Sequence, residues 1–389
     1  MTDVAAAVLV DTPAAWRAAA ECVRAAARIA LDLEADGFHR YPERTALLQL
    51  ALPDGALFLL DPLALPELDA LGAALADPAV PIIVHSSSYD VRALDRDFDF
   101  HIRGLVDTSI AAQLAGGTQL GLGNVLAEAL DIDLPKPKRL QRFDWSRRPL
   151  PAEALEYAAG DVAHLFELTD VLTARLVALG RTAWLEEECR RAEAVRHDPP
   201  VPPVDAFWRV RGARELTSQA RAVLRELFVF REAEAQRIGR PPHHVLSNDA
   251  LLALANEPDA RLDRVGGVGA AVRGAARDRL RAAIERGREA GPLPWPRRTV
   301  VNPWTSPSRD RLLALKAWRK GEAERLGLEA GILWPMAHLE QIALHPQADM
   351  ATLDDADAPA VRRWQWAELG PSLEDLRRSD AWRALAVNP

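Results

Sequence analysis

The chain has few cysteines and no long apolar run. Its 389 residues include 2 cysteines, Cys22 and Cys189, which are too few for a disulfide framework or a cysteine-rich zinc site. A reducing, cytoplasmic compartment is therefore expected. No hydrophobic stretch approaches the length of a membrane span. The first residues also lack the basic start and apolar core of a signal peptide, so we expect no membrane partner and no export.

The sequence also lacks the G-x-x-x-x-G-K-[ST] pattern of phosphate-binding loops, so we expect neither a nucleotide cofactor nor a nucleotide-driven motor. Its 48 basic and 56 acidic residues give a net charge of −8. This balance argues mildly against nucleic-acid binding driven by bulk charge. An acidic protein can still bind phosphates locally, where metal ions neutralise carboxylates and basic patches hold the backbone.

Two acidic residues stand in an apolar stretch near the N-terminus. The stretch ARIALDLEAD, residues 27–36, predicts a buried strand, and its alternation places Asp32 and Glu34 on one face. Carboxylates on a buried strand are costly unless a cation neutralises them. The alternative is an edge strand whose acids face solvent, and the apolar flanks argue against it.

Three further polar residues stand in two later motifs. Asp90 lies in VPIIVHSSSYDVRAL, residues 80–94, where a strand gives way to a helix. Tyr157 and Asp161 lie in a stretch that predicts one long amphipathic helix over residues 152–178, and their spacing of four stacks them on one side. A tyrosine packed on the core is the alternative for Tyr157. Divalent cations suit such carboxylates, and two of them can clamp the oxygens of a phosphoryl displacement.

These motifs, in this order, resemble the DEDD exonuclease superfamily, in its tyrosine-bearing (DEDDy) branch, and within it the ribonuclease D family. The D-x-E motif is matched by Asp32 and Glu34, the strand–helix aspartate by Asp90, and Y-x-x-x-D by Tyr157 and Asp161. The stretches YPERTALLQL, VDTSIAAQL and KRLQRFDWSRRPL also look like ribonuclease D. The order and setting of the motifs make the resemblance specific.

The resemblance implies a ribonuclease H-like α/β domain and a metal-dependent exonuclease. Asp32 is expected to bridge two divalent cations, Mg²⁺ or Mn²⁺, which favour oxygen ligands. Glu34 and Asp161 are expected to complete the tighter site, and Asp90 to support the second, partly through water. Tyr157 is expected to orient the attacking water, since a phenol with a pKa near 10 is a poor base.

Three other residues near the motifs bear on the site. Glu156 stands five residues before Asp161, where the alternative branch carries a histidine, and this excludes the histidine branch. His85 and Asp107 are expected to support the strand–helix junction without binding metal themselves, and direct metal binding is the alternative for Asp107. A histidine with no role in the site is an equal alternative for His85.

A basic segment, KPKRLQRFDWSRRP at residues 136–149, precedes the third motif. Basic side chains that follow phosphates, with an aromatic available for stacking, are typical of a single-strand channel. A solvated loop is the alternative. Aromatic residues after the D-x-E strand are candidates for stacking on the terminal base. The predicted nucleic-acid contacts are Lys136, Lys138, Arg139, Arg142, Trp145, Arg147, Arg148, Phe38, His39 and Tyr41.

The second half of the chain is helical and contains a repeat. FREAEAQRIG at 230–239 aligns with WRKGEAERLG at 318–327, an offset of 88 residues. The first copy resembles the HRDC domain, and the second is more diverged. We expect the proline-rich linker to separate the exonuclease core from the helical half, so that the exonuclease folds by itself. The predicted units are an exonuclease domain (1–180), a proline-rich linker (181–204), an HRDC domain (205–290), a second proline-rich linker (291–308) and a small all-α HRDC-like domain (309–389).

The sequence therefore predicts a 3′→5′ exoribonuclease that releases nucleoside 5′-monophosphates. By resemblance, its substrates are the 3′ ends of structured RNA such as tRNA precursors. One alternative is a DNA exonuclease that acts on single-stranded DNA in repair. Another is a catalytically silent nucleic-acid-binding scaffold, and the complete acidic set argues against it.

Overall fold

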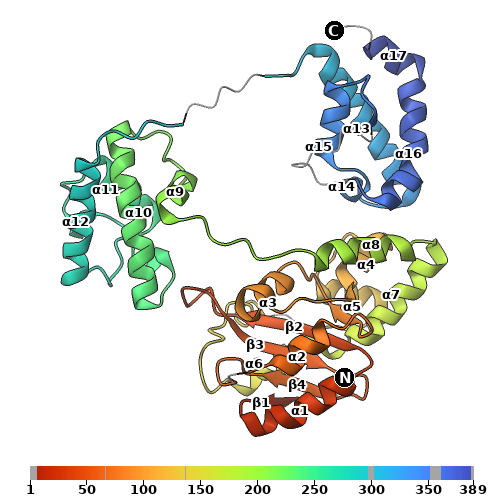
Figure 1. The fold of residues 1–389 in the computed structure, drawn as a ribbon, viewed down its shortest axis with the longest axis horizontal. Coiled ribbons are helices and arrows are strands. Elements are labelled where there is room, and N and C mark those ends of the chain that lie inside the picture. Colours follow the sequence, from red (N-terminus) through yellow and green to blue (C-terminus); the bar gives the residue numbers. More distant parts are fainter. Residues whose placement is uncertain (1–6, 66, 136, 297–301, 351–360, 387–389) are drawn as a thin grey trace.

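The protein folds into an α/β unit followed by two all-helical units (Figure 1). The computed structural model describes residues 7–65, 67–135, 137–296, 302–350 and 361–386. Lys136, one of the predicted nucleic-acid contacts, lies outside them. Within these ranges no helix is long and apolar enough to cross a bilayer.

A six-stranded mixed sheet forms the centre of the first unit, in the order β1-β4-β3-β2-β5-β6. β2 and β4 are antiparallel to β3, and the other neighbouring pairs are parallel. The α/β fold that the sequence predicts is thereby confirmed. The strands are β1 (Val8–Val10), β2 (Ile29–Ala35), β3 (Thr45–Ala51), β4 (Leu57–Leu60), β5 (Ile82–Val84) and β6 (Leu105–Asp107).

Helices cover this sheet and differ from the sequence prediction at one point. A single helix was expected over 152–178, but His164, with φ −114° and ψ 10°, leaves the helical region and divides it in two. The helices are α1 (Pro13–Ala25), α2 (Asp69–Leu75), α3 (Asp90–Phe98), α4 (Thr108–Leu114), α5 (Leu122–Leu130), α6 (Ala152–Ala163), α7 (Leu165–Leu179) and α8 (Thr182–Glu193).

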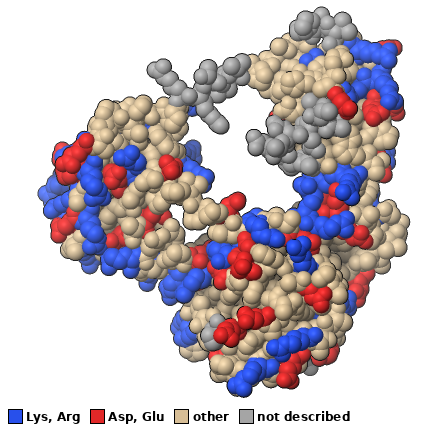
Figure 2. All heavy atoms as spheres, viewed as in Figure 1, with Lys and Arg blue, Asp and Glu red and all other residues tan. Residues whose placement is uncertain are grey.

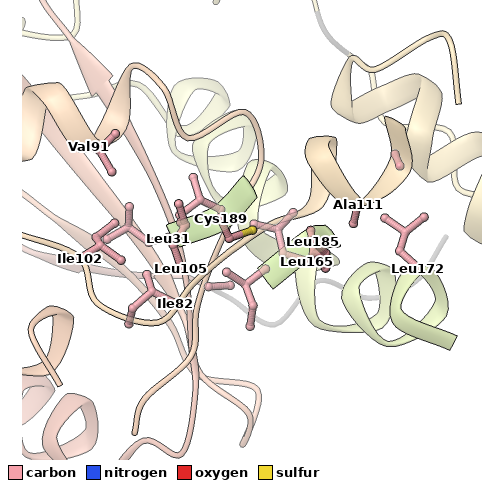
Figure 3. Close-up of a cluster of buried hydrophobic side chains, with 14 of the residues drawn as sticks. Leu31, Ile82, Val91, Ile102, Leu105, Ala111, Leu165, Leu172, Leu185 and Cys189 are labelled. Carbon is pink, nitrogen blue, oxygen red and sulfur yellow. The ribbon is translucent and has the colours of Figure 1, made fainter. Parts of the chain in front are cut away.

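Helix α8 belongs to the packed core of this unit. In Figure 3 its Cys189 lies beside Leu31 of β2 and Leu105 of β6, and its Leu185 lies beside Leu165 of α7. Leu185 is 7% exposed and Cys189 is 3% exposed. The segment expected as a linker therefore begins with a structural helix, and the extended connection follows only after it.

The first helical unit has a hydrophobic core of its own. Its members include Phe207, Leu224, Leu254 and Leu280, each fully buried. This segment therefore has the separate hydrophobic core that is expected of a small domain. Its helices are α9 (Pro203–Ala206), α10 (Ser218–Ile238), α11 (Asn248–Asn256) and α12 (Ala275–Glu289).

The second helical unit repeats this order of helices. Helices α10, α11 and α12 begin at 218, 248 and 275, and α13, α15 and α16 begin at 306, 336 and 363, so each pair differs by 88 residues. This constant offset supports the duplication. The HRDC character of the second copy stays a prediction. Its helices are α13 (Ser306–Leu326), α14 (Ala330–Leu333), α15 (Met336–Leu344), α16 (Arg363–Arg378) and α17 (Asp380–Ala386).

The second helical unit packs on the α/β unit through α8. The rings of Trp184 and Trp364 stack with centroids 4.4 Å apart, and Arg362 Nε lies 3.1 Å from Glu188 Oε1. One hydrophobic cluster also includes buried residues of both units. The expectation that the exonuclease core stands apart from the whole helical half is therefore wrong for this unit.

Candidate active site

Asp32 and Glu34 lie on a central strand rather than an edge strand. β2 pairs with β3 on one side and with β5 on the other, which rules out the edge-strand alternative. Leu31 and Leu33 point to the opposite face and are buried, whereas both acids are partly exposed. Because alternate residues of a strand point to the same side, the carboxylates of Asp32 and Glu34 lie on one face of the sheet.

Asp90 is the first residue of α3, which follows the short strand β5. β5 runs parallel to β2, so the chain leaves both strands at the same end of the sheet. The side chain of Asp90 is 4% exposed. A polar residue so buried has to be held by its surroundings, because burial without compensation is costly.

Asp107 and His85 provide that support. Asp107 accepts hydrogen bonds from the backbone N–H groups of Ser86 (3.0 Å) and Ser87 (2.8 Å), in the turn before α3, and it also caps α4. His85 contacts Thr108 Oγ1 at 2.8 Å through Nδ1. These bonds hold the strand–helix junction that carries Asp90, and the role of both residues in the site stays a prediction.

Tyr157 and Asp161 come from α6, which packs across β2, β3 and β4. Ala154 and Ala158 on the same helix face pack with Leu47 of β3, so the small side chains let α6 approach the sheet closely. Asp161 is 4% exposed. The helix therefore delivers both side chains to the face that carries Asp32.

Negative charge accumulates where these elements meet. The pKa of Asp32 is raised well above its ordinary value, first by burial and then by the charges of Asp90, Asp161 and Glu34. Burial, with a smaller effect of Asp107, raises the pKa of Asp90 to about 7. The structure thus brings the four predicted carboxylates together, and such a cluster favours cation binding.

The phenol of Tyr157 belongs to the same cluster. Its pKa is raised above the ordinary value, first by burial and then by the charges of Asp161, Glu34 and Asp32. Its ring lies beside that of Trp145, with centroids 6.1 Å apart. The hydroxyl therefore stays protonated and can act as a hydrogen-bond donor.

A second group of possible metal ligands lies away from the four acids. Among the described residues, the group whose ligand atoms all lie within 4.8 Å of one another is Asp95, Asp99 and His101, at the exposed end of α3. In that group His101 forms an ion pair with each of the two aspartates, at 2.8 Å from Asp95 and 3.6 Å from Asp99.

A cavity of about 450 Å³ opens beside Glu34. Phe38 and Tyr89, on loops that follow β2 and β5, are 63% and 43% exposed. Tyr89 donates a hydrogen bond to Glu43 at 2.7 Å, which fixes its ring. The cavity is lined by Leu33, Glu34, Ala35, Gly37, Phe38, Glu43, Tyr89, Gln141 and Trp145.

Part of the predicted basic segment is available to a ligand. Lys138, Arg142 and Arg147 are exposed. Arg139 pairs with Glu153. Arg148 is committed within the protein instead, because it bonds to Asp61 at 2.5 and 2.7 Å and to the carbonyl oxygen of Ala46 at 2.9 Å.

Two predicted stacking residues are placed elsewhere by the structure. Trp145 is 1% exposed and packs against Phe143 and Tyr157, so its ring supports the site from behind and does not stack on a base. Tyr41 packs on the first helical unit and donates to Glu232. The sequence pattern gave no sign of either contact, because both depend on tertiary packing.

His39 and Phe38 stay beside the site. His39 Nε2 lies 2.8 Å from the carbonyl oxygen of Arg142, which ties the loop after β2 to the basic segment. Basic and acidic side chains alternate over all three units on the face drawn in Figure 2. Affinity for a polyanion therefore depends on local groups rather than on bulk charge.

Comparison with known proteins agrees with this geometry. A family model described as 3'-5' exonuclease matches residues 7–177, and an HRDC domain model matches residues 220–274. Ribonuclease D of Granulibacter bethesdensis is 30% identical over 366 residues, 90% of this chain and 88% of that protein. Ribonuclease D of Gluconacetobacter diazotrophicus is 29% identical over 98% of this chain and 95% of its own length.

Solved structures show the same relationship. E. coli RNase D, described as an exoribonuclease involved in structured RNA processing, superposes with a TM-score of 0.71 at 26% identity, over 95% of this chain and 98% of that one. The catalytic core of RRP6 from Trypanosoma brucei gives 0.67 at 25% identity, over 75% and 82%. Fold and site define a 3′→5′ exonuclease with an HRDC domain. The chain belongs to the ribonuclease D family of exoribonucleases.

Three residues of the site were missed in the sequence. Tyr89 and Gln141 line the cavity, and only the fold shows that their loops meet there. Gln49 lies in β3 directly opposite Asp32. A single amide in the apolar stretch TALLQLA was a signal that could have drawn attention to it.

Proposed function

We propose that the protein shortens RNA from the 3′ end, releases nucleoside 5′-monophosphates and trims structured RNAs such as tRNA precursors. The observation that carries the proposal is the convergence of Asp32, Glu34, Asp90 and Asp161, with Tyr157 among them. The preference for structured RNA is supported by the similarity to E. coli RNase D, which is described as acting in structured RNA processing.

The four carboxylates fit two divalent cations, Mg²⁺ or Mn²⁺. Their oxygens are hard ligands, and the charges that raise the pKa of Asp32 are those of other carboxylates, so cations would relieve the repulsion. Asp32, Glu34, Asp90 and Asp161 would hold the cations, and Asp32 is the carboxylate on which the charges of all three others act. When bound, such cations activate water and stabilise charge on the leaving oxygen.

Tyr157 would position the attacking water. Its raised pKa keeps the phenol protonated, so it donates a hydrogen bond and does not accept the proton. Trp145 packs beside its ring and limits the orientations open to the hydroxyl. The contribution of Tyr157 is therefore orientation of the nucleophile.

The substrate strand would reach the carboxylates over the basic segment. Lys138, Arg142 and Arg147 are exposed there and would contact phosphates. The exposed ring of Phe38, at the cavity beside Glu34, would stack on a base. Contacts to phosphates and stacking on a base do not depend on which base is present, so we expect no sequence preference from them.

A cytoplasmic location is part of the proposal. Both cysteines are free thiols, Cys22 exposed and Cys189 buried. Free thiols are usual in a reducing compartment.

The proposal is tested with RNA and DNA single strands of the same sequence, each labelled at the 5′ end, in Mg²⁺ or Mn²⁺. We expect a ladder that shortens from the 3′ end, nucleoside 5′-monophosphates as products, and faster cleavage of RNA. A 3′-phosphate should slow the reaction. A circular RNA serves as the control, and its cleavage would show an endonuclease and contradict the proposal. Faster cleavage of DNA would support the DNA exonuclease alternative.

A further inference from the structure

Gln49 is an anomaly in the centre of the sheet. Every residue of β3 is buried, and the strand is otherwise apolar apart from Thr45 at its start. Gln49 is 0% exposed, yet neither its amide nitrogen nor its amide oxygen has a hydrogen-bond partner in the described part of the chain. An unsatisfied buried amide is unfavourable, and an apolar side chain of similar shape would avoid the cost.

The position of Gln49 relates it to the catalytic face. It pairs directly with Asp32 of β2 on one side and with Leu59 of β4 on the other. Directly opposed residues of antiparallel strands point to the same face, with Cβ atoms about 4.5–5.5 Å apart. Leu59 and Leu47 on this face pack with Ala158 of α6, so Gln49 lies beneath the helix that carries Asp161.

The chemistry of an amide suits this place. A lysine or arginine here would neutralise Asp32 and compete with a bound cation, whereas a neutral N–H donor can orient a carboxylate and leave its charge intact. An amide also keeps the same state across the whole working range of pH. Proteins often retain an unfavourable buried polar group where it serves a functional site, and the amide of Gln49 is such a group.

We propose that Gln49 is a positioning residue for Asp32. Its amide N–H donates to a buried water that in turn donates to the Asp32 carboxylate, and this bridge holds the carboxylate in the orientation that cations require. This inference rests on the proposed role of Asp32 as a cation ligand. It assigns Gln49 no contact with RNA or with the reacting atoms.

The test is the Mn²⁺ affinity of the full-length protein, measured by titration calorimetry without RNA. Gln49→Met keeps the volume and removes the amide, and Leu47→Met, its neighbour on the same face, is the packing control. We expect Gln49→Met to bind Mn²⁺ about 10-fold or more weakly, with a melting temperature of the metal-free protein no lower than that of the wild type. With saturating RNA, kcat should fall and KM should stay unchanged.

Unchanged Mn²⁺ affinity in Gln49→Met would overturn the inference, and so would an equal loss of affinity in Leu47→Met. Gln49→Asn, which withdraws the amide by one carbon, should also weaken binding and serves if the methionine variant does not fold. Asp32→Asn is measured beside them. If it binds Mn²⁺ like the wild type, the proposed site itself is wrong, whereas a defect in Asp32→Asn with none in the Gln49 variants rejects Gln49 alone.

Discussion

The hydroxyl of Tyr41 donates a hydrogen bond to Glu232, with the two oxygens 2.6 Å apart across 191 residues of sequence. Tyr41 lies in the loop that leaves the D-x-E strand, and Glu232 lies on α10 of the first helical unit. Burial and then Glu232 raise the pKa of Tyr41 to about 12, so the phenol donates throughout the neutral range. This bond joins the HRDC unit to the loop that follows the strand of Asp32 and Glu34.

Tyr41→Phe should loosen this contact without unfolding either unit. A hydrogen bond to a charged group contributes about 1.5–3 kcal/mol, and Glu232 keeps its pair with Arg231 at 2.8 Å. Amide hydrogen exchange should become faster in the loop around Tyr41. Tyr89→Phe, which loses a tyrosine–glutamate bond within the α/β unit, is the control and should leave that loop unchanged. Identical exchange in Tyr41→Phe and wild type would show that the bond does not hold the loop.

Tyr157→Phe should lower turnover and leave Mn²⁺ affinity intact. The loss of one positioning hydrogen bond corresponds to about tenfold in rate. Because its pKa lies above the ordinary value, Tyr157 stays protonated as the pH rises to 10, and its ionisation should leave no mark on the rate of the wild type below that pH. Single-turnover kinetics across pH and a Mn²⁺ titration check both statements. A variant that no longer binds Mn²⁺ would show that the tyrosine belongs to the cation site instead.

Trp184 and Trp364 should be energetically coupled. Their stacked rings join α8 to α16, and Trp364 Nε1 also donates to Glu188 at 2.8 Å. Stacked aromatic pairs contribute about 0.5–1.5 kcal/mol beyond their burial. A double-mutant cycle with Trp184→Ala and Trp364→Ala, followed by denaturant unfolding, should give a coupling energy in this range. Additive losses would mean that the two rings are not energetically coupled.

Arg142 and Arg148 should differ although both stand in the basic segment. Arg142 is exposed, so Arg142→Ala should weaken RNA binding and reduce the salt slope by about 0.7. Arg148 is bonded to Asp61, so Arg148→Ala should mainly lower the free energy of unfolding. RNA binding over a salt series and denaturant unfolding separate the two effects. Equal salt slopes for both variants would contradict the assignment.

Local sequence patterns predicted most of the catalytic face. Asp32 and Glu34 follow from a period of two, and Tyr157 and Asp161 from a spacing of four, because these periods are set by the backbone itself. Strands β1 and β6, of three residues each, were not predicted.

Contacts between distant segments could not be predicted in the same way. The docking of Tyr41 on α10 and the burial of Trp145 depend on which elements meet in the folded chain. The same residue types in an exposed loop would stack on bases, so composition alone favoured that interpretation. The packing of α16 on α8 is a further case, because a proline-rich stretch separated the two units in sequence.

The account rests on the four carboxylates as the cation-dependent catalytic site, and Asp32→Asn tests it most directly. Asparagine keeps the size of the side chain and removes the negative charge of Asp32, which the neighbouring carboxylates of Glu34, Asp90 and Asp161 repel. A 5′-labelled RNA strand is incubated in Mg²⁺ with the wild type or with Asp32→Asn, after circular dichroism has shown that both are folded. The wild type should produce a ladder that shortens from the 3′ end, and the variant should leave the RNA intact. Equal cleavage by the two proteins would contradict the account.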